Sequence, residues 1–328
     1  MRRVQPAVQT LALGHIRRGR RPRGHPALVS VVCRATMWGM GRVLGAVWST
    51  GLGVLLIATT ALATPATAGA ACRASLTAGR HTLEVEVAGT RRHVILQVPH
   101  VAPDVRPAAV IAFHGYTAHA WQLEETSGLS DLADELGFVV AYPEALGDPT
   151  VWRFDSTARG DTSDIELTVA VIDALVEQAC VDPERVILAG HSMGGGMASD
   201  AACRLAGRVA GVALIAALWL DPPCQPTRPV AVVSTHALDD PVLRYGGGPL
   251  PNAGPGAQLL AVEEALASWG ARDGCGSTPA TTAGADGSAI LAWPDCRAPV
   301  LLHRLASGGH DWPAMASGLI VELLAGTG

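Results

Sequence analysis

Short apolar runs alternate with stretches of helical periodicity through most of this chain. Apolar or alternating segments predict strands at residues 83–87, 92–98, 108–114, 138–141, 185–189, 211–216, 230–235 and 300–305. Apolar residues three and four apart predict helices at residues 129–136, 163–179, 259–269 and 313–324, and Ser163-Asp164-Ile165-Glu166 has the pattern of a capping box. This alternation predicts an α/β fold, with a mostly parallel central sheet of about eight strands and helices on both faces.

The first 70 residues have a different composition. Residues 1–42 contain nine arginines and no acidic residue, and residues 43–72 contain no charged residue. Small residues at 66–70 close this apolar stretch, as they do before the cleavage site of a secretory signal. We therefore expect residues 1–70 to be a basic leader and secretory signal, and residues 71–328 to be one folded domain of an exported protein.

Two alternatives stay open for the leader, and the charge of the rest excludes some partners. Translation from Met37 or Met40 would leave a signal of ordinary length, and the uncharged stretch could also span a bilayer as an uncleaved anchor. Residues 71–328 carry 15 arginines, no lysine and 29 acidic residues, a net charge of −14 with neutral histidines. We therefore expect no nucleic-acid partner and no stable membrane association after cleavage. The oligomeric state stays open.

Cysteine usage supports export. Six cysteines follow the leader: Cys72, Cys180, Cys203, Cys224, Cys275 and Cys296. An even number in an exported chain predicts disulfide bonds, and Cys275 with Cys296, which flank one loop, are the favoured pair. The other four allow three pairings, and Cys72 could instead be a lipidated N-terminus. No cysteine has metal-ligand spacing with histidine, so we expect no metal site.

A glycine-rich turn separates one predicted strand from small residues that can form a closely packed helix. Gly190-His191-Ser192-Met193-Gly194 lies between the apolar run 185–189 and the small residues of 194–202. Strand, sharp turn and helix are the setting of a nucleophile elbow, which needs small residues on both sides of the serine. The pattern predicts Ser192 as a nucleophile; the alternative is a glycine-rich turn before an ordinary helix.

A nucleophilic serine needs a base and an acid, and both stand where the topology requires them. Asp240 follows the strand at 230–235, and His310 follows the last strand. The carboxyl ends of parallel strands meet at one edge of a sheet, and serine, acid, histidine is the chain order of α/β-hydrolases. An imidazole takes the serine proton and a carboxylate orients that imidazole, so we predict Ser192, Asp240 and His310 as catalytic residues.

Other residues compete for these roles. Asp239 is the nearest alternative to Asp240 as the acid, and Asp221 is a weaker one because it too follows a strand. His236 ends a predicted strand and His303 lies within one, so each is a less favoured base than a histidine in a loop. For His310 itself, the alternative is an ordinary histidine of a surface loop.

An acyl transfer also needs two backbone donors for the oxyanion. The N–H of Met193 is one by construction of the elbow, and the loop after the strand at 108–114 supplies Tyr116 as the second candidate. Trp152 and Trp219 follow predicted strand ends and could line an aromatic acyl pocket. Both tryptophans could equally well be core residues.

At these motifs the chain resembles secreted esterases of the polyhydroxybutyrate depolymerase and feruloyl esterase type, in carbohydrate esterase family one of the α/β-hydrolases. The matching stretches are 113–117, 135–143, 181–186, 190–197, 240–242 and 308–313, and Gly308-Gly309-His310-Asp311-Trp312-Pro313 is the most specific. The resemblance implies the same triad and supports the Cys275–Cys296 pair. The chain departs from the family pattern at His236-Ala237, where His-Gly is usual, and at Ser163-Asp164, where two acids are common.

Together these patterns predict a secreted serine esterase that works through an acyl-enzyme and needs no cofactor. Its expected substrates are feruloyl or acetyl esters of plant polysaccharide, or polyhydroxybutyrate-type hydroxyalkanoate esters. One alternative is an acyltransferase of the mycolyltransferase type, which differs only in the acceptor. Another is a non-catalytic secreted binding protein on a hydrolase scaffold.

Overall fold

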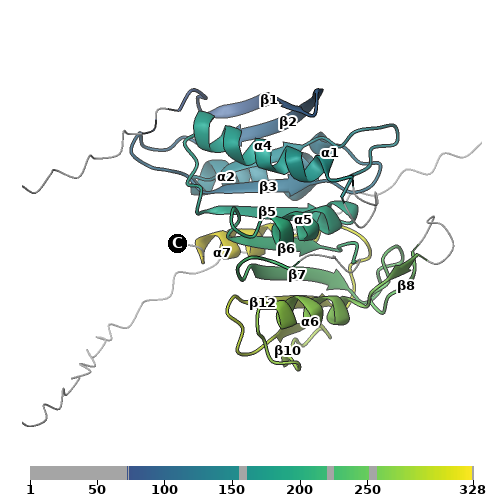
Figure 1. Cartoon of the computed structure of the whole chain (residues 1–328). Helices are drawn as coiled ribbons and strands as arrows, with labels where there is room; N and C mark the ends of the chain where they lie inside the picture. The colour runs from purple at the N-terminus through teal and green to yellow at the C-terminus, as the bar shows by residue number, and fades with distance from the viewer. Residues whose placement is uncertain (1–71, 73, 155–160, 220–224, 251–256, 327–328) are drawn as a thin grey trace, which may run out of the picture. The chain divides into compact units, whose positions relative to one another are not determined.

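One ten-stranded sheet organises the protein (Figure 1). The computed structural model describes residues 72, 74–154, 161–219, 225–250 and 257–326. The strands of the sheet are β1 (Gly79–Val87), β2 (Thr90–Val98), β3 (Ala109–Phe113), β4 (Val139–Pro143), β5 (Val186–His191), β6 (Gly211–Ile215), β7 (Ala231–Ala237), β10 (Ala280–Ala283), β11 (Ala289–Ala292) and β12 (Val300–Leu305). They lie in the order β1-β2-β4-β3-β5-β6-β7-β12-β11-β10. The strands from β4 to β12 in this order are parallel, and antiparallel pairs close both edges.

Helices cover both faces of the sheet. They are α1 (Ala120–Ser127), α2 (Leu129–Leu136), α4 (Ser163–Gln178), α5 (Met193–Arg204), α6 (Val262–Arg272) and α7 (Ala316–Ala325), and a separate short pair joins β8 (Gly248–Pro249) to β9 (Gln258–Leu259). Apolar residues of α4, α5 and α6 pack in the core on one face, which is in front in Figure 1. Residues of α1, α2 and α7 pack in the core on the other face.

The predicted α/β architecture is confirmed. In β3, Ile111 belongs to one core and its neighbours Val110 and Ala112 to the other, which explains why the strand is an unbroken apolar run. All the predicted strands are present, but the sheet is larger than expected because the pattern missed β10 and β11. β10 is exposed at every position and so carries no apolar signal.

The start of α4 differs from the predicted capping box. Thr162 is the N-cap and makes no side-chain capping bond. The Asp164 side chain is instead fully buried, where it accepts hydrogen bonds from the Arg92 guanidinium at 2.6 Å and from the Arg153 N–H at 2.6 Å. A buried carboxylate requires a cationic partner, so Asp164 pairs with Arg92 instead of capping the helix. This ion pair links α4 to β2.

Disulfide bonds join distant parts of the chain. The favoured pair Cys275–Cys296 is present, and a second bond joins Cys72 to Cys180. Cys203 is also disulfide-bonded, and Cys224 lies outside the described residues, as does the whole predicted leader at 1–70. Within the described ranges, none of the helices has both the length and the apolar character that crossing a bilayer requires.

Candidate active site

Ser192 occupies the sharp turn between β5 and α5. Its φ is 55° and its ψ is −121°, a conformation that L-residues rarely adopt. The turn requires glycine at positions 190 and 194, because backbone atoms occupy the space that a side chain would need at either position. A side chain on Gly190 would collide with the Gly194 carbonyl, and one on Gly194 would collide with the carbonyls of Phe113 and His114. The predicted strand–turn–helix setting is therefore what this sequence forms.

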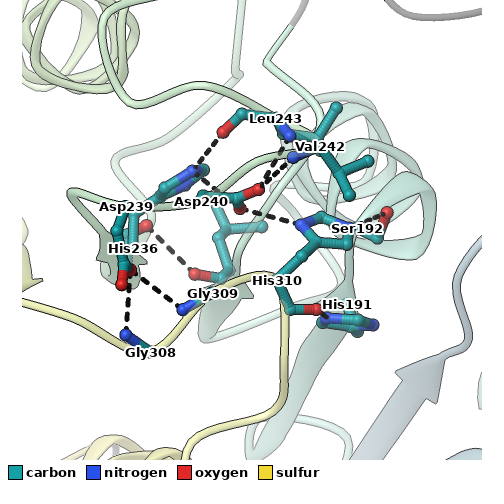
Figure 2. Close-up of polar contacts among 12 residues, drawn as sticks. His191, Ser192, His236, Asp239, Asp240, Val242, Leu243, Gly308, Gly309 and His310 are labelled. Atoms are coloured by element: carbon teal, nitrogen blue, oxygen red, sulfur yellow. Dashed lines mark hydrogen bonds and ion pairs between the residues drawn. The ribbon is translucent and has the colours of Figure 1, made fainter.

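The structure brings Ser192, His310 and Asp240 into one hydrogen-bonded chain (Figure 2). Ser192 Oγ lies 2.8 Å from His310 Nε2, and His310 Nδ1 lies 2.8 Å from Asp240 Oδ2. A carboxylate only accepts hydrogen bonds, so His310 Nδ1 carries the proton and Nε2 is free to accept the one on Ser192. The imidazole is therefore held in the tautomer that a general base requires.

Asp240 is buried, yet it is surrounded by donors. Its Oδ1 accepts the backbone N–H groups of Val242 and Leu243, both at 2.8 Å. Its Oδ2 faces His310 and also His236 Nε2 at 3.2 Å. Burial alone would raise the pKa of Asp240, but the hydrogen bonds from the two imidazoles and the two N–H groups outweigh it and lower the pKa to about 2. Asp240 is thus ionised at neutral pH.

The residues that competed with Asp240 and His310 lie elsewhere or act differently. Asp239 Oδ1 accepts the N–H groups of Gly308 and Gly309 at 2.9 and 3.0 Å, so it holds the loop that carries His310. His303 lies on β12, where burial lowers its pKa, and Asp221 falls outside the described residues. His236 contacts the acid rather than the serine.

His191 is a supporting residue that the sequence did not reveal. Its Nε2 donates a hydrogen bond to the His310 carbonyl at 3.1 Å, and the two rings lie 5.1 Å apart. Burial, followed by the nearby His310, lowers the pKa of His191 to about 4, so its ring is neutral near pH 7. The signal in the sequence was only its place before Ser192, and nothing there gives the direction of its side chain.

The loop after β3 lies against the nucleophile turn. A Cβ added to Gly115 would stand 3.4 Å from Ser192 Cβ, which is ordinary contact. The Gly115 carbonyl accepts a hydrogen bond from His114 Nδ1 at 2.8 Å, because His114 Nε2 already accepts the Ala145 N–H. In a planar trans peptide the N–H points opposite to the C=O, so the Tyr116 N–H points away from the His114 ring. Met193 begins α5, and its N–H has no acceptor inside the helix.

Trp152 and Trp219 do not line a surface pocket, so that prediction is wrong. Trp152 is 1% exposed and Trp219 is 3% exposed, and both belong to the core on the α4 side. The Trp152 indole packs 4.8 Å from the His114 ring and donates to the His114 carbonyl at 2.7 Å. Large indoles near strand ends fill the space under the loops here. The aromatic side chains exposed in and after the β3 loop are Tyr116 and Trp121.

Among the residues that the structure describes, no group of three His, Cys, Asp or Glu side chains could hold a metal ion.

Comparisons with known proteins point to esterases. Residues 93–266 match the family described as Esterase PHB depolymerase. The chain is 32% identical to the putative esterase NocK of Nocardia uniformis over 70% of this chain and 73% of that protein. It is 28% identical to feruloyl esterase B of Piromyces equi over 67% of this chain, but spans only 42% of that longer protein.

Solved structures share the fold. An acetyl xylan esterase from Aspergillus awamori superposes with a TM-score of 0.59 at 17% identity, covering 76% of this chain and 100% of that one. An S-formylglutathione hydrolase from Agrobacterium tumefaciens gives 0.55 at 13% identity, covering 77% of this chain and 98% of that one. With the sheet order described above, these likenesses confirm the α/β-hydrolase fold.

Proposed function

The chain belongs to the Esterase PHB depolymerase family and is an esterase, and we propose that it cleaves carboxylic esters through an acyl-enzyme formed on Ser192. The observation that carries this proposal is the continuous chain of two 2.8 Å hydrogen bonds from Ser192 through His310 to Asp240. A serine hydroxyl is a weak nucleophile until a neutral imidazole can take its proton.

In the proposed reaction, His310 Nε2 takes the proton as Ser192 Oγ attacks the ester carbonyl carbon. The N–H groups of Met193 and Tyr116 bind the oxyanion that forms on the carbonyl oxygen. His310 then gives the proton to the departing alcohol, which leaves an acyl group on Ser192. Water attacks the acyl-enzyme as His310 takes one of its protons; the bond from Ser192 Oγ to the acyl carbon then breaks as His310 returns that proton to Oγ, and the carboxylic acid is released. Asp240 stabilises the imidazolium in both halves of the reaction.

We infer that the substrates are neutral polysaccharide esters, of the feruloyl or acetyl class. The names of the relatives, feruloyl esterases and a bifunctional acetylxylan esterase/xylanase, favour this class over hydroxyalkanoate polyesters. The exposed rings of Tyr116 and Trp121 offer apolar surface to a phenolic acyl group or a sugar face. The net charge of −14 on residues 71–328 disfavours anionic polymers.

A turnover panel tests the proposal. The panel contains methyl ferulate, 4-nitrophenyl esters from acetate to octanoate, acetylated xylan and 3-hydroxybutyrate oligomers, each with and without an added sugar acceptor. We expect hydrolysis of ferulate or acetylxylan, and loss of roughly 10⁴-fold or more in kcat in a folded Ser192→Ala protein. Near-wild-type turnover by that variant would refute the triad. New sugar esters as the main product would make the protein an acyltransferase.

We also propose that the protein is exported. The disulfide bonds Cys72–Cys180 and Cys275–Cys296 are of the kind that forms in oxidising compartments, which supports export. N-terminal sequencing of protein recovered from the culture medium should begin near residue 71. Recovery only from the membrane fraction, with residues 43–72 intact, would favour the uncleaved anchor instead.

A further inference from the structure

We infer that His236, a buried histidine that does not touch Ser192, is a positioning residue that orients the carboxylate of Asp240 and sets the pH range of the reaction. This inference rests on the proposed function, because it assigns His236 a role in the same triad. His236 lies near the end of β7, four residues before Asp240, and its side chain is 1% exposed.

The two contacts of His236 Nε2 define its chemistry. This atom lies 2.7 Å from the Leu243 carbonyl and 3.2 Å from Asp240 Oδ2 (Figure 2). Both neighbours only accept hydrogen bonds, so Nε2 must carry a proton and donate it to them. The second nitrogen, Nδ1, is buried without a partner among the described residues. Because its hydrogen-bond partners all contact Nε2, the His236 ring acts as a fixed hydrogen-bond donor and does not transfer a proton.

This donor closes the loop that carries the acid. Leu243 is held from both sides, because its N–H binds Asp240 Oδ1 at 2.8 Å and its carbonyl binds His236. His236 therefore ties β7 to the far end of the loop, seven residues later, with Asp240 between them. Without the His236 donor, the hydrogen-bond partner left to Asp240 Oδ2 among the described residues would be His310, whose charge changes during every turnover.

The same donor shares Asp240 Oδ2 with His310, and this sharing links His236 to pH. Each N–H on that oxygen takes up part of the carboxylate charge. If the His236 donor is removed, the carboxylate attracts a protonated His310 more strongly, so His310 stays protonated, and inactive as a base, to higher pH. The acid limb of the kcat/KM profile should move upward.

Other titratable groups surround His236 without replacing it. The Tyr245 ring lies 6.0 Å away, and its hydroxyl donates to Glu263, which also pairs with Arg304 opposite His236 on β12. Asp311 shares the wall of a small cavity with His236, and His191 faces His310 from the other side. All of these groups are present both in the wild type and in the His236 variants, so we assign a shift in the profile to the lost donor.

Two substitutions separate the hydrogen bond from the packing. His236→Leu fills the space of the ring with an apolar side chain and removes the hydrogen-bond donor. His236→Gln instead places an amide N–H near the position of Nε2. His303→Leu is the matched control, because His303 lies on the neighbouring strand β12 and its ring makes no hydrogen bond within the described residues. The full chain is used for all variants, and kcat, KM, the pH profile and the melting temperature are measured for each.

We expect His236→Leu to lower kcat by about 10- to 100-fold with little change in KM, since small misplacements of a catalytic group have effects of that size. Its acid limb should move up by as much as about one pH unit. His236→Gln should recover most of both effects, and His303→Leu should match the wild type. A His236→Leu protein with the wild-type kcat and profile would overturn the inference. So would a folded His236→Gln protein as slow as the leucine variant.

A fluorophosphonate probe distinguishes failure of this inference from failure of the proposed function. If Ser192 in the wild-type protein is not labelled, the triad itself is wrong, whatever His236 does. If Ser192 is labelled, and His236→Leu is labelled at the same rate over the whole pH range, only the role of His236 is refuted. Slower labelling of His236→Leu, restored in His236→Gln, supports the role.

Discussion

On one side of Ser192, the start of α5 packs against the end of β3 and leaves no space for a side chain at Gly194. On the other side, side-chain hydrogen bonds hold the loops after β7 and β12. The first side depends on the absence of a side chain at Gly194, because the backbone of Gly194 packs directly against the end of β3. The second side depends on polar groups that are present, such as the Asp239 carboxylate that binds two N–H groups of the His310 loop.

This difference predicts how each side fails. Where packing sets the geometry, an added atom has nowhere to go and the fold itself is at stake. Where side-chain hydrogen bonds set the geometry, a lost contact loosens one loop and changes the rate while the core stays intact. Substitutions on the two sides should therefore separate into stability effects and rate effects.

The largest effect should come from adding one methyl group to the packed side. Gly194→Ala would drive a Cβ into the carbonyls of Phe113 and His114, so we expect loss of folded, active protein, or destabilisation above roughly 4 kcal/mol. Gly318→Ala, in α7 with open space around it, is the control and should stabilise by up to about 1 kcal/mol. Urea unfolding measures both, and a stable, active Gly194→Ala protein would contradict the packing argument.

The next test removes a polar contact from the packed side. Trp152→Phe keeps an aromatic ring but leaves the buried His114 carbonyl without its indole donor, so we expect a loss of about 1–3 kcal/mol and a fall in kcat of up to about 10-fold. Trp269→Phe is the matched control, since it loses an indole bond to Ser199 in the core below α6. It should lower stability similarly and leave kcat unchanged. Equal kcat in the two variants would show that the β3 loop does not depend on Trp152.

A smaller effect is expected on the hydrogen-bonded side. Asp239→Ala removes the acceptor for the N–H groups of Gly308 and Gly309, and kcat should fall by roughly 3- to 10-fold while stability changes by less than about 1 kcal/mol, since Asp239 is exposed. Asp239→Asn keeps the oxygen and should restore the rate. Asp286→Ala removes a similar cap from the exposed turn between β10 and β11 and serves as the control. If Asp239→Ala lowered the free energy of unfolding by more than it raised the activation free energy, the two sides would not differ as proposed.

The sequence predicted the scaffold and the order of the site residues better than their supports. Strands buried on both faces appear as unbroken apolar runs, which is why β3 and β5 were evident. β10 was missed because it is exposed at every position, and α1 because it buries only Ala120, Leu123 and Ser127. The positions of Asp240 and His310 followed from chain order, since the ends of parallel strands must converge.

The supports depend on side-chain directions, which a pattern of residue types does not contain. Asp239 and Asp240 are adjacent and chemically identical, yet one binds the His310 loop and the other the His310 ring. The sequence offered His236 only as a less favoured base and did not single out His191, and it gave no direction for either ring. Trp152 was misplaced for the same reason, because the end of a strand does not reveal whether an indole points outward or down into the core.

The last effect depends on pH and tests whether hydrogen bonds hold the second side. The folded-state pKa of Asp240 is about 2 against 3.8 in the unfolded chain, so its ionised form stabilises the fold. That contribution is complete well above pH 3.8 and is lost as pH falls toward 2. The wild type should therefore exceed Asp240→Asn in unfolding free energy by more at pH 6 than at pH 3, measured in urea. A difference in unfolding free energy that does not depend on pH would mean that the donors around Asp240 hold its side chain in place but do not stabilise its ionised form.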